Sequence, residues 1–288
     1  MKNTYFILLY GILLMGLGAC TTPKQETITL LSLEKPEDNL LAFAKIRASL
    51  DSTEEVVYKW TGWAYSMIEG QRSKKLFQLE GYNIARLVPI DGGYQLLTRE
   101  LMVYKDPKSG EILETWQNPF TSDSVRVLPV LNDPVNAQFM LKGDGWEWGL
   151  PYEKMANSRF CMYMDVLLLY PSPLPIAEYP KNSQSDMYQA GELFQFFADL
   201  EEVSNPASKN VTAEISWTRV GPWLPWMEMG QAQGQMLYQC RGYKTADGLQ
   251  SLSPELLSLV KVKYPTYLHA PSHYSKPNET SWTYFKKM

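Results

Sequence analysis

Apolar and polar residues alternate in long runs from about residue 54 onward, and this period of two predicts β-strands. Trp, Tyr, Val and Leu are frequent in these runs, as strands favour. Short sequences rich in Asp, Asn, Gly and Pro separate the runs, which is typical of antiparallel hairpins. The longest predicted strands are Glu54–Ile68, Lys74–Pro89 and Tyr94–Lys105.

Strands of this length typically belong to a barrel or a strongly coiled sheet, because a flat two-layer sandwich seldom needs them. Within Tyr94–Tyr104, neither set of alternate residues is cleanly polar, so both faces are partly covered or one face lines a mixed cavity. We therefore predict a mainly β protein: a large antiparallel β-barrel or strongly coiled sheet, calycin- or lipocalin-like in outline, with a few short helices.

Three segments are helical candidates, and a fourth is expected to be the last strand of the sheet. Pro36–Leu50 has acidic residues in its first turn and apolar residues at helical spacing, which predicts an amphipathic helix packed on the sheet. Pro254–Val262, preceded by Ser253, predicts a second helix, and Met187–Gly191 is a weaker helical candidate. Ser281–Phe285 is expected to be the last strand, closing the barrel.

The N-terminus resembles a bacterial lipoprotein signal. Lys2 precedes an apolar run, Tyr5–Met15, that is too short for a stable membrane-spanning helix, and Leu17–Cys20 ends in small residues before a cysteine. We expect cleavage after residue 19 and lipidation of Cys20. Thr21 rather than Asp follows, which favours the outer membrane. The alternative is an ordinary secretory or signal-anchor helix with an incidental cysteine.

The remaining chain is long enough for one well-buried domain, so we expect residues 20–35 to be a tether and residues 36–288 a single β-rich domain. The full chain has 27 basic and 31 acidic residues, a net charge of −4, without basic clusters. Nucleic acid is therefore not an expected partner. The longest later apolar run, Val166–Tyr170, is strand-sized, so the lipid is the only membrane attachment expected. The sequence leaves the oligomeric state open.

Cys161 and Cys240 both lie in apolar, strand-like surroundings. Free buried thiols are the favoured interpretation, with a disulfide as the alternative in an oxidising compartment. Neither cysteine has a neighbouring His or basic cluster that would activate a nucleophile. No motif for a metal, nucleotide or other cofactor is present, so none is predicted.

The segment Trp217–Gly230 is rich in tryptophan and contains two prolines, which predicts an ordered loop. One interpretation is an aromatic lid that closes one end of the core. The alternative is a wall of a ligand pocket. Its candidate ligand-binding residues are Arg219, Trp223, Trp226 and Glu228.

Asn118-Pro119 and Asn132-Asp133-Pro134 are typical of turns between strands. In the functional alternative, Asn132, Asp133 and Asn136 form a polar edge at the mouth of a barrel that can hold a ligand oxygen or a cation. Arg99 is a further candidate, which would fix charge in the pocket as Arg219 or Glu279 would. The chain has two histidines, His269 and His273, in one proline-containing loop near Glu279. These three residues are the candidates for proton transfer, although surface or structural histidines are the simpler interpretation.

Several motifs distributed from about residue 55 to the C-terminus resemble the family known as domain of unknown function 1838. They are Tyr104–Pro107 with Gly110-Glu111, Trp116–Pro119, Leu131–Asn136, Ser216–Arg219, Trp223–Gly230 and Pro277–Trp282. The resemblance brings no settled activity and no catalytic residues to this sequence.

Three functions are consistent with these observations. The first is a lipid-anchored cell-envelope β-barrel that binds a small, largely apolar or aromatic molecule. The second is a cofactor-free isomerase, lyase or hydrolase that uses a His/Glu pair in the same pocket. The third is a structural or assembly lipoprotein. A cavity favours the first two over the third, and a histidine inside that cavity favours catalysis.

Overall fold

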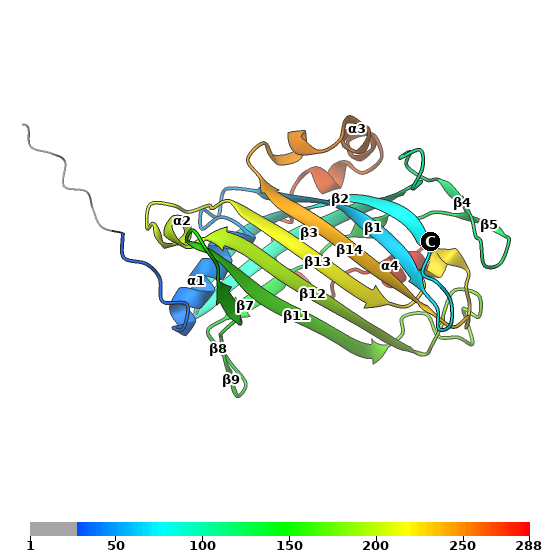
Figure 1. The fold of residues 1–288 in the computed structure, drawn as a ribbon, viewed down its shortest axis with the longest axis horizontal. Helices are drawn as coiled ribbons and strands as arrows, with labels where there is room; N and C mark the ends of the chain where they lie inside the picture. Colours follow the sequence, from blue (N-terminus) through cyan, green and yellow to red (C-terminus); the bar gives the residue numbers. More distant parts are fainter. Residues whose placement is uncertain (1–27) are drawn as a thin grey trace, which may run out of the picture.

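The computed structural model describes residues 28–288 (Figure 1). The predicted signal sequence, the lipidation at Cys20 and the first part of the predicted tether therefore lie outside the described residues. From residue 28 the chain runs onto the domain, where the backbone N–H of Leu31 donates to Ser204 Oγ at 2.8 Å and Leu33 is buried.

One antiparallel sheet of ten strands dominates the fold, in the order β10-β11-β12-β13-β14-β1-β2-β3-β6, with β7 also paired to β3. The three long predicted strands are confirmed as β1, β2 and β3. The strands of the sheet are β1 (Val56–Met67), β2 (Lys75–Ile90), β3 (Gly93–Lys105), β6 (Val130–Asn132), β7 (Ala137–Met140), β10 (Tyr152–Lys154), β11 (Arg159–Pro171), β12 (Met187–Asp199), β13 (Ala213–Gly221) and β14 (Gln235–Thr245). Two small hairpins, β4 (Thr115–Gln117) with β5 (Ser124–Arg126) and β8 (Lys142–Gly143) with β9 (Trp146–Glu147), project from it.

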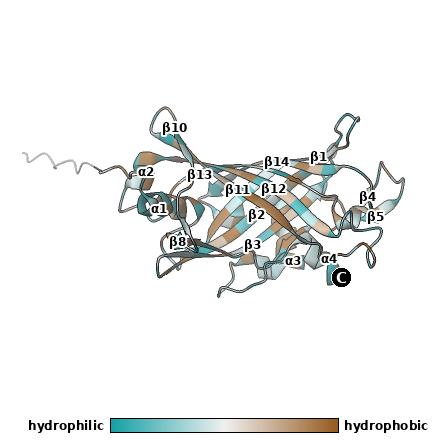
Figure 2. Cartoon of the chain, turned by 90° about the horizontal axis from the view of Figure 1, so that it is seen from below, coloured by the Kyte–Doolittle hydropathy of each residue, from teal (hydrophilic) through white to brown (hydrophobic). Residues whose placement is uncertain are grey.

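The sheet is strongly coiled, as Figures 1 and 2 show, and it is open. Among the described residues no hydrogen-bonded pairing joins the β10–β11 edge to the β6–β7 edge, so the predicted closed barrel is not confirmed. β10 pairs with β11 only from Phe160 to Met162. The Tyr163 N–H still donates to the Pro151 carbonyl at 2.9 Å. From Met164 onward, no strand among residues 28–288 pairs with this side of β11, which is a free sheet edge.

The predicted closing strand at the C-terminus is wrong, because this segment forms helix α4 (Ser281–Lys286). Thr280 Oγ1 accepts from the backbone N–H of Thr283 at 3.2 Å, and Thr283 Oγ1 accepts from that of Thr280 at 2.8 Å. This reciprocal capping starts a helix at the residue where the strand was expected. Trp282, the second residue of this helix, is buried.

The weak helical candidate at Met187–Gly191 is also wrong, because these residues begin strand β12. They pair with the end of β11, from Met187 opposite Pro171 to Gly191 opposite Leu167. A segment of five residues has little helical preference of its own, so pairing with the long neighbouring strand decides its structure.

Helix α1 (Pro36–Arg47) confirms the predicted N-terminal helix and fills one end of the coiled sheet (Figure 1). Phe43, which is completely buried, packs against Phe139 and Phe196 with ring centroids 5.0 and 5.3 Å away. The buried Lys244 Nζ donates to the carbonyls of Lys45 and Ala48 at 2.6 Å each, so it satisfies free carbonyls at the end of the helix. The short helix α2 (Leu200–Ser204) lies at the same end of the molecule.

The tryptophan-rich segment fills the opposite end. Its centre is a 3₁₀ helix, η1 (Pro225–Met227), and Trp226 packs against Phe77, Tyr104 and Trp116 at centroid distances of 5.6, 5.3 and 6.1 Å. This position agrees with the interpretation of the segment as an aromatic lid that closes one end of the core. The predicted loop begins later than expected, because residues 217–221 belong to β13.

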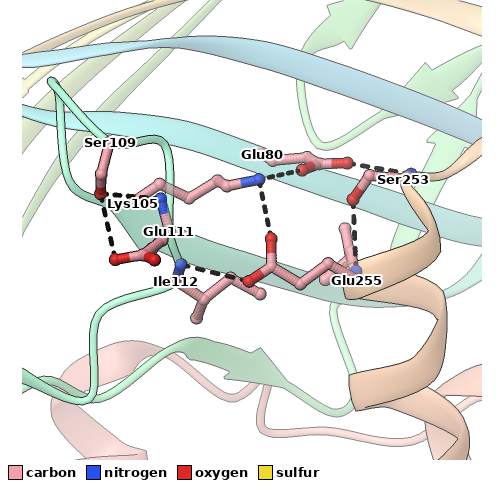
Figure 3. A network of polar contacts seen from close by, with 8 residues as sticks. Glu80, Lys105, Ser109, Glu111, Ile112, Ser253 and Glu255 are labelled. Carbon is pink, nitrogen blue, oxygen red and sulfur yellow. Dashed lines mark hydrogen bonds and ion pairs between the residues drawn. The ribbon is translucent and has the colours of Figure 1, made fainter.

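The outer face of β2 and β3 is covered by η2 (Gly248–Ser251), α3 (Pro254–Lys263) and η3 (Pro265–Leu268). Helix α3 confirms the second predicted helix, and the cap is also confirmed, because Ser253 Oγ accepts from the backbone N–H of Leu256 at 3.2 Å. A polar network fastens its first turn to the sheet (Figure 3). Lys105 Nζ lies 3.1 Å from Glu80 Oε2 and 3.2 Å from Glu255 Oε2, and Glu80 Oε1 accepts from the Ser253 N–H.

Cys161 on β11 and Cys240 on β14 are both free and buried. This arrangement confirms the favoured interpretation of the two thiols. Burial raises the pKa of Cys240 to about 12, so its thiol stays protonated and unreactive at neutral pH.

Candidate ligand-binding cavity

A cavity of about 600 Å³ lies inside the coiled sheet, between the α1 end and the tryptophan-rich end. Its walls are formed by residues of nine strands (β1, β2, β3, β6, β7, β11, β12, β13 and β14), by Arg47 of α1, and by segments 135–136 and 278–280. The apolar lining includes Leu96 of β3, Met164, Val166 and Leu168 of β11, Phe194 and Phe196 of β12, and Ile215 and Trp217 of β13. The mixed face predicted for β3 is therefore a cavity wall, formed by Leu96, Thr98 and Glu100.

Glu100 is the central acidic group of this cavity. Asn132 Nδ2 on β6 donates to Glu100 Oε2 at 2.9 Å. Burial raises the pKa of the Glu100 carboxyl to about 7, and the nearby Glu192 adds to the shift, while Asn132, Arg219 and Arg47 oppose it. At neutral pH the carboxyl is thus close to half protonated and can either donate or accept a hydrogen bond.

Arg219 and Glu192 form the second polar group, at the end of the cavity towards the tryptophan-rich segment. Arg219 Nε lies 3.3 Å from Glu192 Oε1, and its Nη2 donates to the hydroxyl of Tyr188 at 2.5 Å. Trp217 Nε1 donates to the other oxygen of Glu192 at 3.2 Å. These residues border a smaller hollow of about 120 Å³ that shares Glu100 with the larger cavity. The Arg219 charge is therefore neutralised within the protein.

Arg47 is the last residue of α1 and lines the opposite end of the cavity. Its guanidinium carbon lies 5.5 Å from the ring centroid of Tyr58 and 5.6 Å from that of Phe196. In the part of the chain from residue 28 to 288, this guanidinium has no hydrogen bond or ion pair. Burial lowers the pKa of Arg47, but an arginine remains protonated at physiological pH.

Two amide oxygens in this region, Asn83 Oδ1 and Asn132 Oδ1, are buried and lack a hydrogen-bond partner among the described residues. Both side chains line the cavity. A buried acceptor without a donor costs free energy. These two oxygens are therefore available to a donor on a ligand or to an ordered water.

Four of the residues proposed from the sequence border the cavity or the adjoining hollow: Asn132, Asn136, Arg219 and Glu279. Asn136 is largely structural, because its Oδ1 accepts from the Thr98 N–H at 3.0 Å and its Nδ2 donates to the Ser275 carbonyl at 3.1 Å. Glu279 forms an ion pair with Lys287.

Four of the candidate residues do not line the cavity: Arg99, Asp133, His269 and His273. The expectation that they lie together at a pocket is therefore corrected. Arg99 alternates with the inward Glu100 and points to the outer face, where its Nε lies 2.8 Å from Asp133 Oδ2. Its Nη1 donates to the backbone carbonyl of His269 at 2.7 Å. The His269 side chain is 76% exposed and lies 3.1 Å from Glu55, and His273 is also exposed.

Trp223, Trp226 and Glu228 are also absent from the cavity wall. The two tryptophans are 3% and 4% exposed and belong to the packed core at that end, while Glu228 is exposed in a left-handed backbone conformation. These three residues therefore do not form the pocket wall, whereas Arg219 of the same predicted segment borders the smaller hollow. Trp217 lines the cavity, but from strand β13 rather than from a loop.

Three charged residues of the cavity were not predicted from the sequence: Arg47, Glu100 and Glu192. The alternation within β3 contained a signal for Glu100, because it placed this acid among apolar residues on one face. The sequence around Arg47 held no such signal, since a basic residue in the last turn of a helix is ordinary.

Within residues 28–288, no group of three or more His, Cys, Asp and Glu side chains is arranged to hold a metal ion. None of the helices in this same range combines the length and apolar character needed to cross a membrane.

The fold and the cavity define a class of protein: a mainly β domain whose single coiled antiparallel sheet surrounds an apolar cavity with a buried charged centre. Residues 53–288 match the family described as a protein of unknown function, DUF1838, and the chain belongs to this family. A search of curated proteins finds no match to the sequence.

Proposed function

We propose that this protein binds a small, largely apolar or aromatic molecule in the cavity between the two packed ends of the sheet. The cavity itself carries the proposal: its volume of about 600 Å³ lies within the range of about 300–1,000 Å³ that is usual for small-molecule sites. Apolar walls with a few charged and amide groups are also typical of such sites.

In this proposal, the coiled sheet surrounds a ligand cavity with the calycin-like outline expected from the sequence. The packed ends of the sheet and the C-terminal segment bound the cavity, so a closed ring of hydrogen-bonded strands is not needed. The free edge of β11, which includes Val166 and Leu168, provides the side on which a ligand enters.

The binding test uses the fluorescence of N-phenyl-1-naphthylamine, a neutral aromatic probe. Val166→Trp places a large ring in the cavity, and Leu167→Trp is its matched control because Leu167 is the adjacent residue and is 78% exposed on the outer face. We expect the wild type and Leu167→Trp to bind the probe alike, and Val166→Trp to bind roughly tenfold more weakly. Absence of saturable binding to the wild type, or equal binding to all three proteins, would contradict the proposal.

A second candidate function is proton transfer to or from a molecule held in the same cavity, with Glu100 rather than a histidine as the acid or base. The pKa of Glu100 near 7 favours this candidate. The test incubates metabolite extracts with wild-type protein or Glu100→Gln and follows conversion by mass spectrometry. Conversion by the wild type alone supports catalysis, and its absence from both supports binding without chemistry.

We also propose that the domain is held at the cell envelope, with the outer membrane favoured, by a lipid on Cys20. The sequence Leu17–Cys20 and the apolar run before it support this proposal. In a Gram-negative host, the full chain should incorporate an alkyne-labelled fatty acid and fractionate with membranes. Cys20→Ser should lose the label, and label retained by that variant would contradict lipidation at this residue.

A further inference from the structure

We propose that the cavity is built for an organic anion: an apolar or aromatic molecule whose carboxylate binds Arg47 at the α1 end. This inference rests on the proposed binding function and specifies the chemical class of the ligand. It follows from the charged groups of the cavity, which leave one cation unpaired at a wall that is otherwise apolar.

Pairing within the protein accounts for Arg219, Glu192 and Glu279, whereas Glu100 has no cationic partner within contact distance among residues 28–288. Arg219 contacts Glu192 at 3.3 Å, and Glu279 is paired with Lys287. Glu100 accepts a hydrogen bond from the neutral amide of Asn132 at 2.9 Å. Arg47 therefore supplies the one cationic group lining the cavity in residues 28–288 that has no anionic partner within contact distance.

The surroundings of Arg47 suit recognition of a carboxylate. The rings of Tyr58 and Phe196 lie against its guanidinium, and Tyr58 is held in place because its hydroxyl donates to the Ile46 carbonyl at 2.5 Å. Rings that contact the face of a guanidinium leave its N–H donors available in the plane, where a carboxylate accepts two hydrogen bonds. A positioned and partly desolvated arginine binds an anion more strongly than a solvated one.

The rest of the cavity suits the apolar part of such a ligand. From Arg47, the wall continues along Met164 and Val166 of β11 and along Phe194 of β12. These side chains offer no charge and no strong hydrogen bond. A molecule with its carboxylate at Arg47 therefore places its hydrocarbon or aromatic body against them and removes apolar surface from water.

Glu100 makes this binding dependent on pH. The charged or titratable groups that act on it are Arg47 from α1, Glu192 from β12, Arg219 from β13, Tyr104 from its own strand and Cys240 from β14. Its pKa is about 7, so Glu100 is neutral below that pH and negatively charged above it. An anion in the same cavity is repelled by the charged form, so its affinity falls as the pH rises through 7.

The experiment compares cis-parinaric acid with its methyl ester, and 9-anthracenecarboxylic acid with its methyl ester, by fluorescence titration at pH 6.0 and 8.5. Within each pair, a methyl group replaces the charge of the carboxylate, and the two pairs distinguish a linear hydrocarbon body from a flat aromatic one. At pH 6.0 we expect the wild type to bind at least one acid roughly tenfold more tightly than its ester, which corresponds to about 1.4 kcal/mol.

Arg47→Met keeps an apolar stem like that of arginine and removes the charged guanidinium. We expect the preference for the acid over the ester to disappear in this variant, while affinity for the ester stays the same. Arg47→Lys should keep a reduced preference because it retains the charge. Arg72→Met, at an exposed arginine in the β1–β2 turn, should behave as the wild type. Glu100→Gln should bind the acid equally at both pH values.

Equal binding of acid and ester by the wild type overturns the inference without the use of any variant, as does an acid preference that persists in Arg47→Met. In either case, continued binding of N-phenyl-1-naphthylamine leaves the proposed binding function intact. If the wild type binds none of the acids, the esters or that neutral probe, the proposed function itself is wrong.

Discussion

The buried carboxyl of Glu100 should make the stability of the folded protein depend on pH, and Glu100→Gln isolates this effect. Glutamine has nearly the same shape, and its side-chain oxygen still accepts the hydrogen bond from Asn132. It cannot ionise, so it imitates the protonated acid at every pH. Any pH-dependent difference in unfolding free energy between the two proteins therefore reports the ionisation of this one group.

The sign and magnitude follow from the two pKa values. The Glu100 pKa is about 7 in the folded protein, compared with 4.5 for an exposed glutamate. Below pH 4.5 both states are protonated and the wild type retains its full stability. As the pH rises from 4.5 to 7, the unfolded chain releases the proton before the folded one does, so stability is lost. At about 1.4 kcal/mol per pH unit, the loss above pH 7 reaches about 3 kcal/mol as an upper value.

The assay is urea unfolding followed by tryptophan fluorescence between pH 4.5 and pH 8.5. The two proteins should unfold at similar urea concentrations at the lowest pH, and Glu100→Gln should be the more stable by about 1–3 kcal/mol at pH 8. Glu178→Gln, at an exposed carboxylate without a hydrogen bond or ion pair, is the control and should show no such trend. A constant difference between wild type and Glu100→Gln across this range would refute the reasoning, because it would show that the Glu100 pKa is the same in both states.

Three further substitutions test the packing around the cavity by the same unfolding assay. Trp226→Ala removes a ring that is 4% exposed and should cost about 3–5 kcal/mol, whereas Trp146→Ala, at a ring that is 48% exposed, should cost less than about 1 kcal/mol; similar losses would mean that the tryptophan-rich end is loosely packed. Asn118→Ala removes the buried amide that donates to the Met227 carbonyl and should cost about 1–3 kcal/mol, and an unchanged midpoint would show that this contact does not hold the segment. Lys105→Met leaves the largely buried Glu80 without its cation and should lower the unfolding midpoint; an unchanged midpoint would show that this ion pair does not stabilise the fold.

The positions of the long strands β1, β2 and β3 could be predicted from the sequence, because alternation with a period of two is a local property of the chain. The same reasoning applies to helix α1 and helix α3, whose capping and acidic residues lie within or next to their own segments. Prediction failed at Ser281–Lys286, where an apparent strand alternation competes with the capping pair Thr280 and Thr283, and the capping pair prevails.

The candidate site was predicted in part only. The alternation of β3 indicated a mixed face, and Asn132, Asn136, Arg219 and Glu279 border the cavity or the adjoining hollow. The two histidines were grouped with them because they are close in sequence to Glu279. Their loop instead packs on the outer face of the sheet, and sequence distance did not reveal which side of the sheet the loop follows.

The sequence alone thus determined the β character of the protein, the extents of β1, β2 and β3 and its membership of one family, because these depend on local periodicity and on motifs. The tertiary structure alone decided that the sheet stays open and that Arg47, Glu100 and Glu192 face one cavity. Pairing within a hairpin depends on neighbouring residues, whereas the enclosure of a cavity depends on which distant segments cover each face. Glu100 and Arg99 are adjacent in the chain, and only the curvature of the sheet and the elements packed on it make one residue internal and the other external.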